Sequence, residues 1–399
     1  MSDIALSERV RRIKSSPTLA VSNRAKELRA EGRDVIGLGA GEPDFDTPDH
    51  IKQAAIVAIQ AGETKYTAVD GTPALKQAII EKFAHDNALN YTAEQILVSA
   101  GGKHSFFNLA QALLNNGDEV IIPAPYWVSY PDMVLLADGV PVIVPAGIEQ
   151  SFKITAKQLE STITKKTRLL VINSPSNPTG AAYSKNELVA LADVLLRHPQ
   201  VMVATDDMYE HILWSDEPFQ NIVNVCPDLY DRTMVLNGVS KAYSMTGWRI
   251  GYAGGPAVLI AAMKKIQSQS TSNPCSIAQA AATAALSGDQ RCVQLMVKEF
   301  QRRHDHVVKR LNALQGVHCL PSHGTFYAFP DMREAIARLD GVNNDIELAE
   351  HLLNKADVAM VPGSAFGADG YMRLSYALDM ASLDKALDRI QKVFDIEKS

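Results

Sequence analysis

The stretch NGVSKAYSMTGWRIGYAGGP, residues 237–256, decides the fold. It sets Lys241 among small residues, and Arg249 follows eight positions later (249 − 241 = 8). Apolar runs flank the lysine at 233–238 and 249–255, and each is long enough to form a buried strand. A lysine in such a place is either a solvated turn residue or a group with a chemical role at the end of a sheet. The residues that end the other strands decide between these two interpretations.

The same kind of apolar run recurs along the chain. Seven such runs are present, at 95–102, 118–125, 140–146, 168–175, 201–207, 233–238 and 249–255. Most are rich in Val, Ile and Leu without alternation, as expected for strands buried on both faces. Helical patterns lie between several of them, for example at 103–116 and 184–198. The pattern predicts an α/β fold in which helices cover a mostly parallel, seven-stranded sheet, with ligands at the carboxyl ends of its strands.

The composition changes after about residue 285. A long helical stretch at 291–314 leads into strand-like pieces at 324–331 and 371–378 and a closing helix at 381–398. These elements predict a second, smaller α+β domain. We therefore expect three parts: an N-terminal arm with part of the small domain (1–48), a large domain (49–290) and the small C-terminal domain (291–399).

The bulk composition excludes several classes of partner. The chain has 399 residues and a formal net charge of −6, from 39 basic and 45 acidic residues, which argues against nucleic acid or an anionic membrane as partner. Its four cysteines form no CxxC pair and have no histidines at zinc-site spacing, so no metal site is expected. There is neither a secretory signal nor an apolar run long enough to span a bilayer, so we expect a cytoplasmic protein.

The first predicted strand ends in a glycine turn, SAGGKHS (99–105), that opens a helix. Paired glycines at a helix N-terminus leave backbone N–H groups free to bind a phosphate, although a plain tight turn has the same appearance. Lys103 favours the phosphate, because a cation in the first helical turn opposes the helix dipole unless an anion lies nearby.

Other predicted strands also end in polar or aromatic residues. Asn177 in NSPSNPTG (173–180) either shapes a turn or offers its amide to a ligand, and Trp127 in PYWVSYP (125–131) either packs in the core or stacks on a flat cofactor. In VATDDMYEH (203–211), Asp207 fits a helix N-cap.

Two further charged residues call for partners. Asp206, one residue nearer the strand than Asp207, is expected to be the more buried of the two and to need a cation. Arg373, in the strand-like piece of the second domain, is either a solvated edge residue or a bidentate site for a carboxylate.

Taken in order, these motifs resemble the class I/II aminotransferases, pyridoxal-phosphate enzymes of fold type I, and most closely their bacterial aspartate aminotransferase type. The resemblance runs over nearly the whole chain, through AGEPDFDTP (40–48), KYTAVDGTPALKQAI (65–79), PYWVSYP, NSPSNPTG, DDMYEH (206–211), SKAYSMTGWRIGYAGGP (240–256) and MRLSYA (372–377). It implies transamination between aspartate and 2-oxoglutarate by a ping-pong reaction.

The resemblance implies how the cofactor is held. Lys241 matches the lysine that forms the Schiff base with the cofactor aldehyde. Arg249 matches the arginine that pairs with the cofactor phosphate, and Gly101 and Gly102 match the glycines that offer it their amides. Tyr66 matches a tyrosine that the neighbouring subunit lends to the phosphate, which implies an obligate homodimer.

Further residues match the groups around the cofactor ring. Asp206 matches the carboxylate that faces the pyridine nitrogen, and it is expected to be catalytic together with Lys241 and Tyr209. Tyr209 and Asn177 match the pair that hydrogen-bonds the ring hydroxylate, and Trp127 matches the aromatic residue stacked on the ring.

The substrate site follows from the same resemblance. Arg373 matches the clamp for the substrate α-carboxylate, with Gly41 as a backbone contact, and Trp127 and Asn177 are also expected beside the substrate. Lys103 matches a lysine implicated in binding a distal carboxylate in the bacterial subgroup. The N-terminal arm could add the hydroxyls of Ser16 and Thr18.

Gly238 departs from the pattern, because many relatives carry a serine there that meets the phosphate. Three alternatives stay open: a prephenate or aromatic aminotransferase of the same fold, a pyridoxal-phosphate carbon–sulfur lyase, and a non-catalytic ligand-binding domain.

Overall fold

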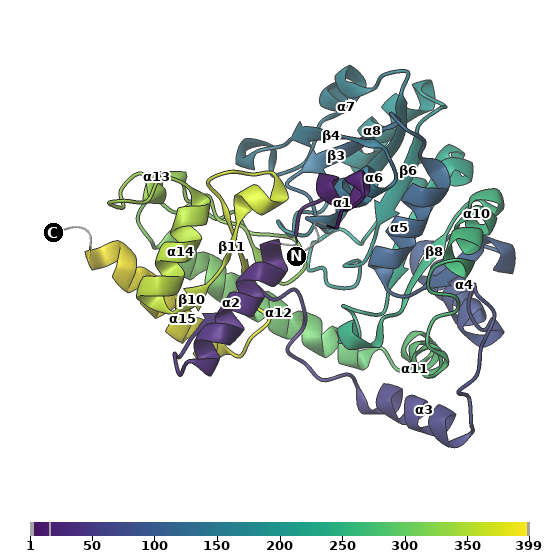
Figure 1. The fold of residues 1–399 in the computed structure, drawn as a ribbon, viewed down its shortest axis with the longest axis horizontal. Coiled ribbons are helices and arrows are strands. Elements are labelled where there is room, and N and C mark those ends of the chain that lie inside the picture. The colour runs from purple at the N-terminus through teal and green to yellow at the C-terminus, as the bar shows by residue number, and fades with distance from the viewer. Residues whose placement is uncertain (1–3, 16, 397–399) are drawn as a thin grey trace.

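A seven-stranded sheet forms the centre of the larger part of the molecule (Figure 1), in a computed structural model that describes residues 4–15 and 17–396. Its strand order is β2-β8-β7-β6-β5-β3-β4. The bounds are β2 Ile96–Ser99, β3 Glu119–Ala124, β4 Val140–Pro145, β5 Thr167–Asn173, β6 Met202–Asp206, β7 Thr233–Gly238 and β8 Gly251–Gly254. Neighbours from β4 to β7 pair parallel, and only β8 runs antiparallel to its neighbours β7 and β2. The predicted α/β fold with a mostly parallel sheet of seven strands is confirmed.

Both faces of this sheet are buried, which explains why the strands show no alternation. In β5, Leu170 and Ile172 belong to one hydrophobic core, whereas Leu169 and Val171 belong to the core on the opposite face. The first core includes side chains of α4 Pro73–Asn87, α8 Lys185–Arg197 and α11 Ser276–Ser287, and the second includes those of α5 Gly102–Leu113, α6 Ser129–Leu136 and α10 Ala257–Ser268. The edge strand β4 is the exception, because one side of it is open and Val140 is 45% exposed.

A third hydrophobic core joins the C-terminal part of the chain to an N-terminal segment. Ile36 and Leu38 lie in it, and β1 pairs parallel with β10 through Ile36↔Val358. A small antiparallel sheet, β11-β12-β9, lies in the same part. The bounds here are β1 Ile36–Gly37, α12 Arg291–Asn312, β9 Tyr327–Ala328, α13 Arg333–Ile336, α14 Asp345–Ala356, β10 Val358–Ala359, β11 Val361–Pro362, β12 Met372–Ser375 and α15 Met380–Ile396. This pairing agrees with our proposal to group residues 1–48 with the last domain; the three domain boundaries stay predictions.

Five further α-helices complete the described part of the chain. They are α1 Glu8–Arg12, α2 Pro17–Ala30, α3 Asp49–Gln60, α7 Ala156–Thr162 and α9 Ile222–Val225. Figure 1 shows α3 projecting at the lower right, beside α11, while α2 lies over the C-terminal part. Among the described residues, the helices are all too short or too polar to cross a bilayer.

The parallel strands bring polar residues to one edge of the sheet. Asn173 ends β5 and Asp206 ends β6, and the two are register partners. Asn237 lies at the end of β7, and Lys241 follows three residues after that strand. The sheet thus delivers residues far apart in the sequence to a single site.

Candidate active site

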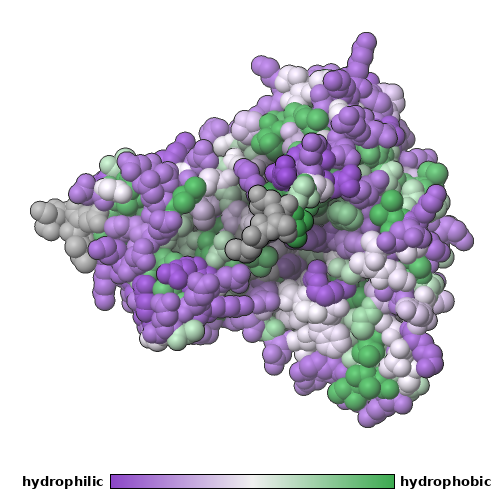
Figure 2. All heavy atoms as spheres, viewed as in Figure 1, coloured by the Kyte–Doolittle hydropathy of each residue, from purple (hydrophilic) through white to green (hydrophobic). Residues whose placement is uncertain are grey.

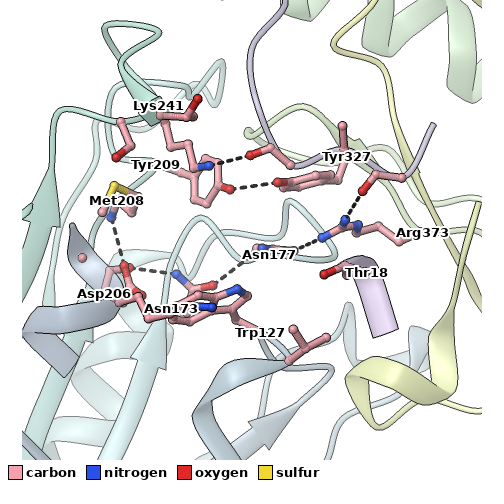
Figure 3. Close-up of a pocket in the computed structure, with 18 of the residues that line it drawn as sticks. Thr18, Trp127, Asn173, Asn177, Asp206, Met208, Tyr209, Lys241, Tyr327 and Arg373 are labelled. Carbon is pink, nitrogen blue, oxygen red and sulfur yellow. Dashed lines mark hydrogen bonds between the residues drawn. The ribbon is translucent and has the colours of Figure 1, made fainter. Parts of the chain in front are cut away.

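A cavity of about 250 Å³ lies at this edge of the sheet, enclosed on its far side by Gly39–Gly41, Tyr327, Arg373 and the start of α2 (Figure 3). The predicted site residues that line it are Thr18, Gly41, Gly102, Lys103, Trp127, Asn177, Asp206, Tyr209, Lys241, Arg249 and Arg373. They come from the N-terminal arm, the large sheet and the small sheet.

Lys241 is half-buried in this cavity, and its Nζ donates a hydrogen bond of 2.5 Å to the Gly41 carbonyl. Burial lowers the pKa of this amine to about 8, and the nearby charges of Arg373 and Arg249 act in the same direction. About one tenth of the amine is therefore neutral and nucleophilic at pH 7, far more than for an exposed lysine. Lys241 is thus not a solvated turn residue.

Asp206 is the one carboxylate on the described wall of the cavity. Tyr130 donates its hydroxyl to Oδ2 at 2.5 Å, and the Met208 amide donates to Oδ1 at 3.3 Å. Burial raises the pKa of this carboxyl, whereas the two hydrogen bonds and the charge of Lys241 oppose that rise. A second cation bound opposite Asp206 would favour its ionised form further.

Asp207 differs from the prediction in two ways. It is the more deeply buried of the two acids, at 1% exposure, and a turn rather than a helix follows it. Its carboxyl accepts hydrogen bonds from Thr205 Oγ1 (2.5 Å) and Asn221 Nδ2 (3.1 Å). Burial and the neighbouring Glu210 raise its pKa to about 8. The N-cap prediction was wrong because neighbouring residues of an extended chain point in opposite directions, and here the second one points inward.

The predicted phosphate turn has the geometry of an anion site. Gly101 precedes α5 with φ of +92°, and a side chain on it would overlap the Arg249 guanidinium. Gly102 is confined in the same way, since a Cβ there would lie 2.5 Å from Met208 Cε. The Gly101 amide already donates to the Ser99 carbonyl at 2.7 Å, so it is the first N–H groups of α5 itself that face the same space as the arginine. Gly238 lies in contact with Ile250 and Met208, where a Cβ would meet atoms at 3.0 Å.

Arg373 is 2% exposed and has only neutral partners. Its Nη1 donates to Asn177 Oδ1 at 2.9 Å and its Nη2 to the Gly39 carbonyl at 2.7 Å. The guanidinium carbon lies 4.5 Å from the centre of the Tyr327 ring, and Nε has no hydrogen-bond partner among the described residues. A buried guanidinium without a carboxylate is costly, so this group is suited to bind an anion.

The aromatic residues frame the space between these charges. The Tyr209 hydroxyl lies 3.0 Å from that of Tyr327. Lys103 Nζ lies 5.2 Å from the centre of the Trp127 ring, and burial together with the charge of Arg249 lowers the pKa of Lys103.

Sequence reasoning did not single out Tyr327 or Tyr130, and it placed Asn173 at a strand end without giving it a role in the site. Asn173 accepts the Asn177 amide at 2.8 Å and donates to the Asp206 carbonyl at 2.9 Å, so it fixes the spacing of two predicted residues. The position of Asn173 at a strand end, which the sequence did show, was the available signal.

Two predicted residues do not line the cavity, and a third cannot be compared with it. Tyr66 is 93% exposed, on the loop between α3 and α4, and does not line the cavity. Gly101 lies under Arg249 rather than on the cavity wall. Ser16 is outside the described residues, whereas Thr18 lines the cavity from α2.

Known proteins resemble this chain over almost its full length. Residues 33–390 match the family of class I and II aminotransferases. The chain is 60% identical over 390 residues to an aspartate/prephenate aminotransferase of Nitrosomonas europaea, covering 96% of this chain and 98% of that relative. It is 57% identical over 390 residues to the enzyme of the same name from Cereibacter sphaeroides, covering 97% and 98%.

Solved structures give the same result. The aspartate aminotransferase from Rhizobium meliloti superposes with a TM-score of 0.95 at 48% identity, over 98% of this chain and 99% of that one. The aspartate aminotransferase from Thermus thermophilus with maleate superposes with a TM-score of 0.91 at 43% identity, over 98% and 100%. This chain therefore belongs to the class I and II aminotransferases, enzymes that use pyridoxal 5′-phosphate.

Proposed function

We propose that this aminotransferase moves the amino group of L-aspartate to 2-oxoglutarate and that prephenate is its second candidate acceptor. The charge balance of the cavity carries the proposal. Four cationic side chains, those of Lys103, Lys241, Arg249 and Arg373, line it against the single carboxylate of Asp206. Such a wall suits ligands that together carry a phosphate and more than one carboxylate. The names of the relatives, which combine aspartate and prephenate, support both acidic substrates.

The residues present fit pyridoxal phosphate. The glycine turn can lie directly against the Arg249 guanidinium only because Gly101 lacks a side chain, and this brings the arginine to the start of α5. Arg249 and the Gly102 amide, which line the cavity, would hold the phosphate, and Lys241 would hold the aldehyde carbon.

The ring of the coenzyme would meet the other side of the cavity. Asp206 would face the ring nitrogen, Tyr209 and Asn177 the ring oxygen, and Trp127 one face of the ring. When bound, the coenzyme supplies the electron sink for the reaction.

Lys241 is the base in this proposal. Its pKa of about 8 lies close to the pH at which an enzyme works, so the amine can accept the α-proton of the substrate and return it. Arg373 binds the α-carboxylate, which replaces its neutral partners Asn177 and Gly39 and also reaches the unpaired Nε. The burial of Arg373 excludes competing water and strengthens the ion pair between its guanidinium and the α-carboxylate.

Lys103 is our candidate for the distal carboxylate of aspartate. It stands in the first turn of α5, where the helix dipole disfavours a cation unless an anion lies over it. The segment IQSQSTSNP (266–274) contains no basic residue that could serve instead. Thr18 lines the same cavity from α2 and can add a hydroxyl.

Kinetics of Lys103→Ala test this assignment. The variant should lose about 2–4 kcal/mol in kcat/KM for aspartate, as expected for one partner of a desolvated charge pair, and much less for alanine and phenylalanine. Lys265→Ala is the matched control, because Lys265 is exposed near the end of α10 and does not line the cavity. An equal loss with all three amino acids would remove Lys103 from the substrate site.

Product analysis tests the reaction itself. Incubation with aspartate and 2-oxoglutarate should give glutamate, and replacing 2-oxoglutarate by prephenate shows whether the second acceptor is used. A carbon–sulfur lyase would make no new amino acid in either mixture.

A homodimer is part of the proposal. The projecting helix α3 exposes Ile56, Val57 and Ile59 at 44%, 53% and 52%, and Figure 2 shows hydrophobic surface gathered where α3 lies. Tyr66 follows on the adjoining loop at 93% exposure, as expected for a side chain that completes the site of a second copy. Light scattering should give twice the mass of the chain.

A further inference from the structure

The loop that carries Tyr66 has an unusual number of buried anchors. Residues 61–72 contain no helix or strand, yet the loop lies against β2, at the free edge of the large sheet. Val98 in β2 donates its amide to the Asp70 carbonyl at 3.0 Å. Gly71 has φ of +108° and fits only because it lacks a side chain that would strike Val98. The loop is therefore held in one conformation while the Tyr66 side chain stays exposed.

Gln267 uses its whole carboxamide in this anchoring. It is fully buried, and its Nε2 donates to the Val69 carbonyl of the loop at 2.7 Å and to the Val98 carbonyl at 2.8 Å. Its Oε1 accepts from Ser99 Oγ at 2.8 Å and from Asn108 Nδ2 at 2.9 Å. Every hydrogen-bonding position of the side chain is satisfied.

The partners of Gln267 belong to two different functional regions. Ser99 ends β2 two residues before Gly101, and Asn108 is on α5, the helix whose first turn forms the anion site. Val69 lies three residues after Tyr66 on the loop. One side chain thus connects the anion site of its own subunit with the loop that presents Tyr66.

A second glutamine holds the loop without hydrogen-bonding to β2 or α5. Gln279, also fully buried, accepts from the Thr72 amide at 2.8 Å and donates to Thr67 Oγ1 at 3.2 Å and to the Pro274 carbonyl at 2.9 Å. None of these partners lies on β2 or α5. Gln279 is therefore a natural control for Gln267.

We propose that Gln267 is a positioning residue that couples the two active sites of the dimer: it aligns the glycine turn in its own subunit and, through Val69, the Tyr66 that enters the partner's site. This inference rests on the proposed homodimer. Because the bonds of Gln267 are shared between both regions, a change at this residue acts on two phosphate sites at once. A change at Ser99 acts only on the subunit that carries it, and a change at Gln279 acts only on the partner.

Hybrid dimers separate these effects. One subunit carries Lys241→Ala and a distinct affinity tag, so that only the other subunit can bind pyridoxal phosphate covalently, and two-step purification isolates the hybrid. Gln267→Met, which keeps the volume but removes the hydrogen bonds, is placed on either subunit. The readout is the rate at which the intact site loses pyridoxal phosphate on dilution, followed by absorbance, and it needs no substrate.

We expect Gln267→Met to speed coenzyme loss about tenfold from either position, since losing buried hydrogen-bond partners has effects of this size. Gln279→Met should act only from the Lys241→Ala subunit. Ser99→Ala should act only from the subunit with the intact site. Should Gln267→Met not fold, Gln267→Leu, which also lacks the hydrogen-bonding groups, takes its place with the same expected outcome.

The outcomes discriminate between the two proposals. If hybrids form and Gln267→Met acts from the intact subunit alone, or from neither, the coupling is refuted while the dimer stands. If tagged subunits never copurify, the homodimer fails and the coupling fails with it. In both cases the proposed reaction stands as long as the wild-type protein makes glutamate from aspartate and 2-oxoglutarate.

Discussion

Replacing Asp207 by asparagine should make the protein more stable at neutral pH. The Asp207 carboxyl is 1% exposed and has a pKa of about 8 because of burial and the nearby Glu210 carboxylate. On folding at pH 7 it must therefore take up a proton that an unfolded aspartate, with a pKa near 3.8, has lost. The free energy of folding at pH 7 is less favourable by at most about 4 kcal/mol, because pH 7 lies 3.2 units above the unfolded pKa (7 − 3.8 = 3.2) and each unit corresponds to about 1.36 kcal/mol.

Asparagine fits the site without that cost. Its oxygen can accept from Asn221 Nδ2, and its amide can donate to Thr205 Oγ1 once that hydroxyl rotates. Since the folded pKa is raised, wild-type stability falls as the pH rises from about 4 to about 8, and Asp207→Asn should lack this slope. Its Tm at pH 7 should be higher by a few degrees, given about 2.1 cal/mol/K of unfolding entropy per residue.

Thermal unfolding of both proteins at pH 5, 7 and 8 measures the effect. Asp216→Asn is the matched control, because Asp216 is exposed and the same substitution there should leave the Tm nearly unchanged. A lower Tm for Asp207→Asn at pH 7, or an unchanged slope with pH, would show that Asp207 is ionised and that the burial argument is wrong.

Three further predictions concern other buried charges. In coenzyme-free protein, the rate at which Lys241 reacts with a small aldehyde should increase with pH, with a midpoint near pH 8 rather than 10.5. Arg373→Gln should move that midpoint upward, because the charge of Arg373 helps to lower the pKa of Lys241. A midpoint near 10.5 in both proteins would contradict the burial of the amine. Lys82→Met should cost about 3–5 kcal/mol in urea unfolding at pH 7, because it removes the lysine that pairs with the buried Glu210 carboxylate. Burial raises the pKa of Glu210, but the charges of Lys82 and His211 and the hydrogen bonds from Asn87 and Lys82 together lower it to about 2. The stabilisation is therefore full above about pH 4.5 and is lost as the pH falls toward 2; a difference between wild type and variant that persists in strong acid would refute this. Arg373→Lys should lower kcat/KM for aspartate about a hundredfold, since an ammonium cannot bind a carboxylate in the bidentate way, and near-normal kinetics would show that Arg373 does not contact the substrate.

Much of the large sheet could be predicted because its strands are apolar on both faces. Each of the seven predicted runs overlaps a strand, and the helical patterns at 103–116 and 184–198 overlap α5 and α8. Residues 371–378 contain a strand of only four residues, Met372–Ser375, and 324–331 one of only two, Tyr327–Ala328. Such short strands depend on their partners rather than on their own pattern, so their bounds could not be read from the sequence.

The site was predictable to the extent that strand ends mark it. Asp206 and Lys241 follow buried strands, and parallel strands bring such ends together. Tyr327 could not be found in this way, because its place beside Arg373 results from the pairing of β9 with β12. Asp207 was misjudged because the sequence does not show toward which side a residue points once a strand has ended.

The cationic side chains of the cavity reduce the stability of the folded protein, and this cost indicates that they serve a function. Arg373 is buried among neutral acceptors and two aromatic rings, and Lys241 lies close enough to it that the two cations repel. Folding thus brings together positive groups that would be better hydrated apart. A core selected only for stability would replace them by apolar side chains. The site instead keeps the charges in place before any ligand arrives, so that an anionic substrate and the coenzyme phosphate meet groups that need no reorganisation. Ligands that supply the missing negative charge should therefore raise the stability of the whole protein by mass action, and dicarboxylates should do so more than monocarboxylates.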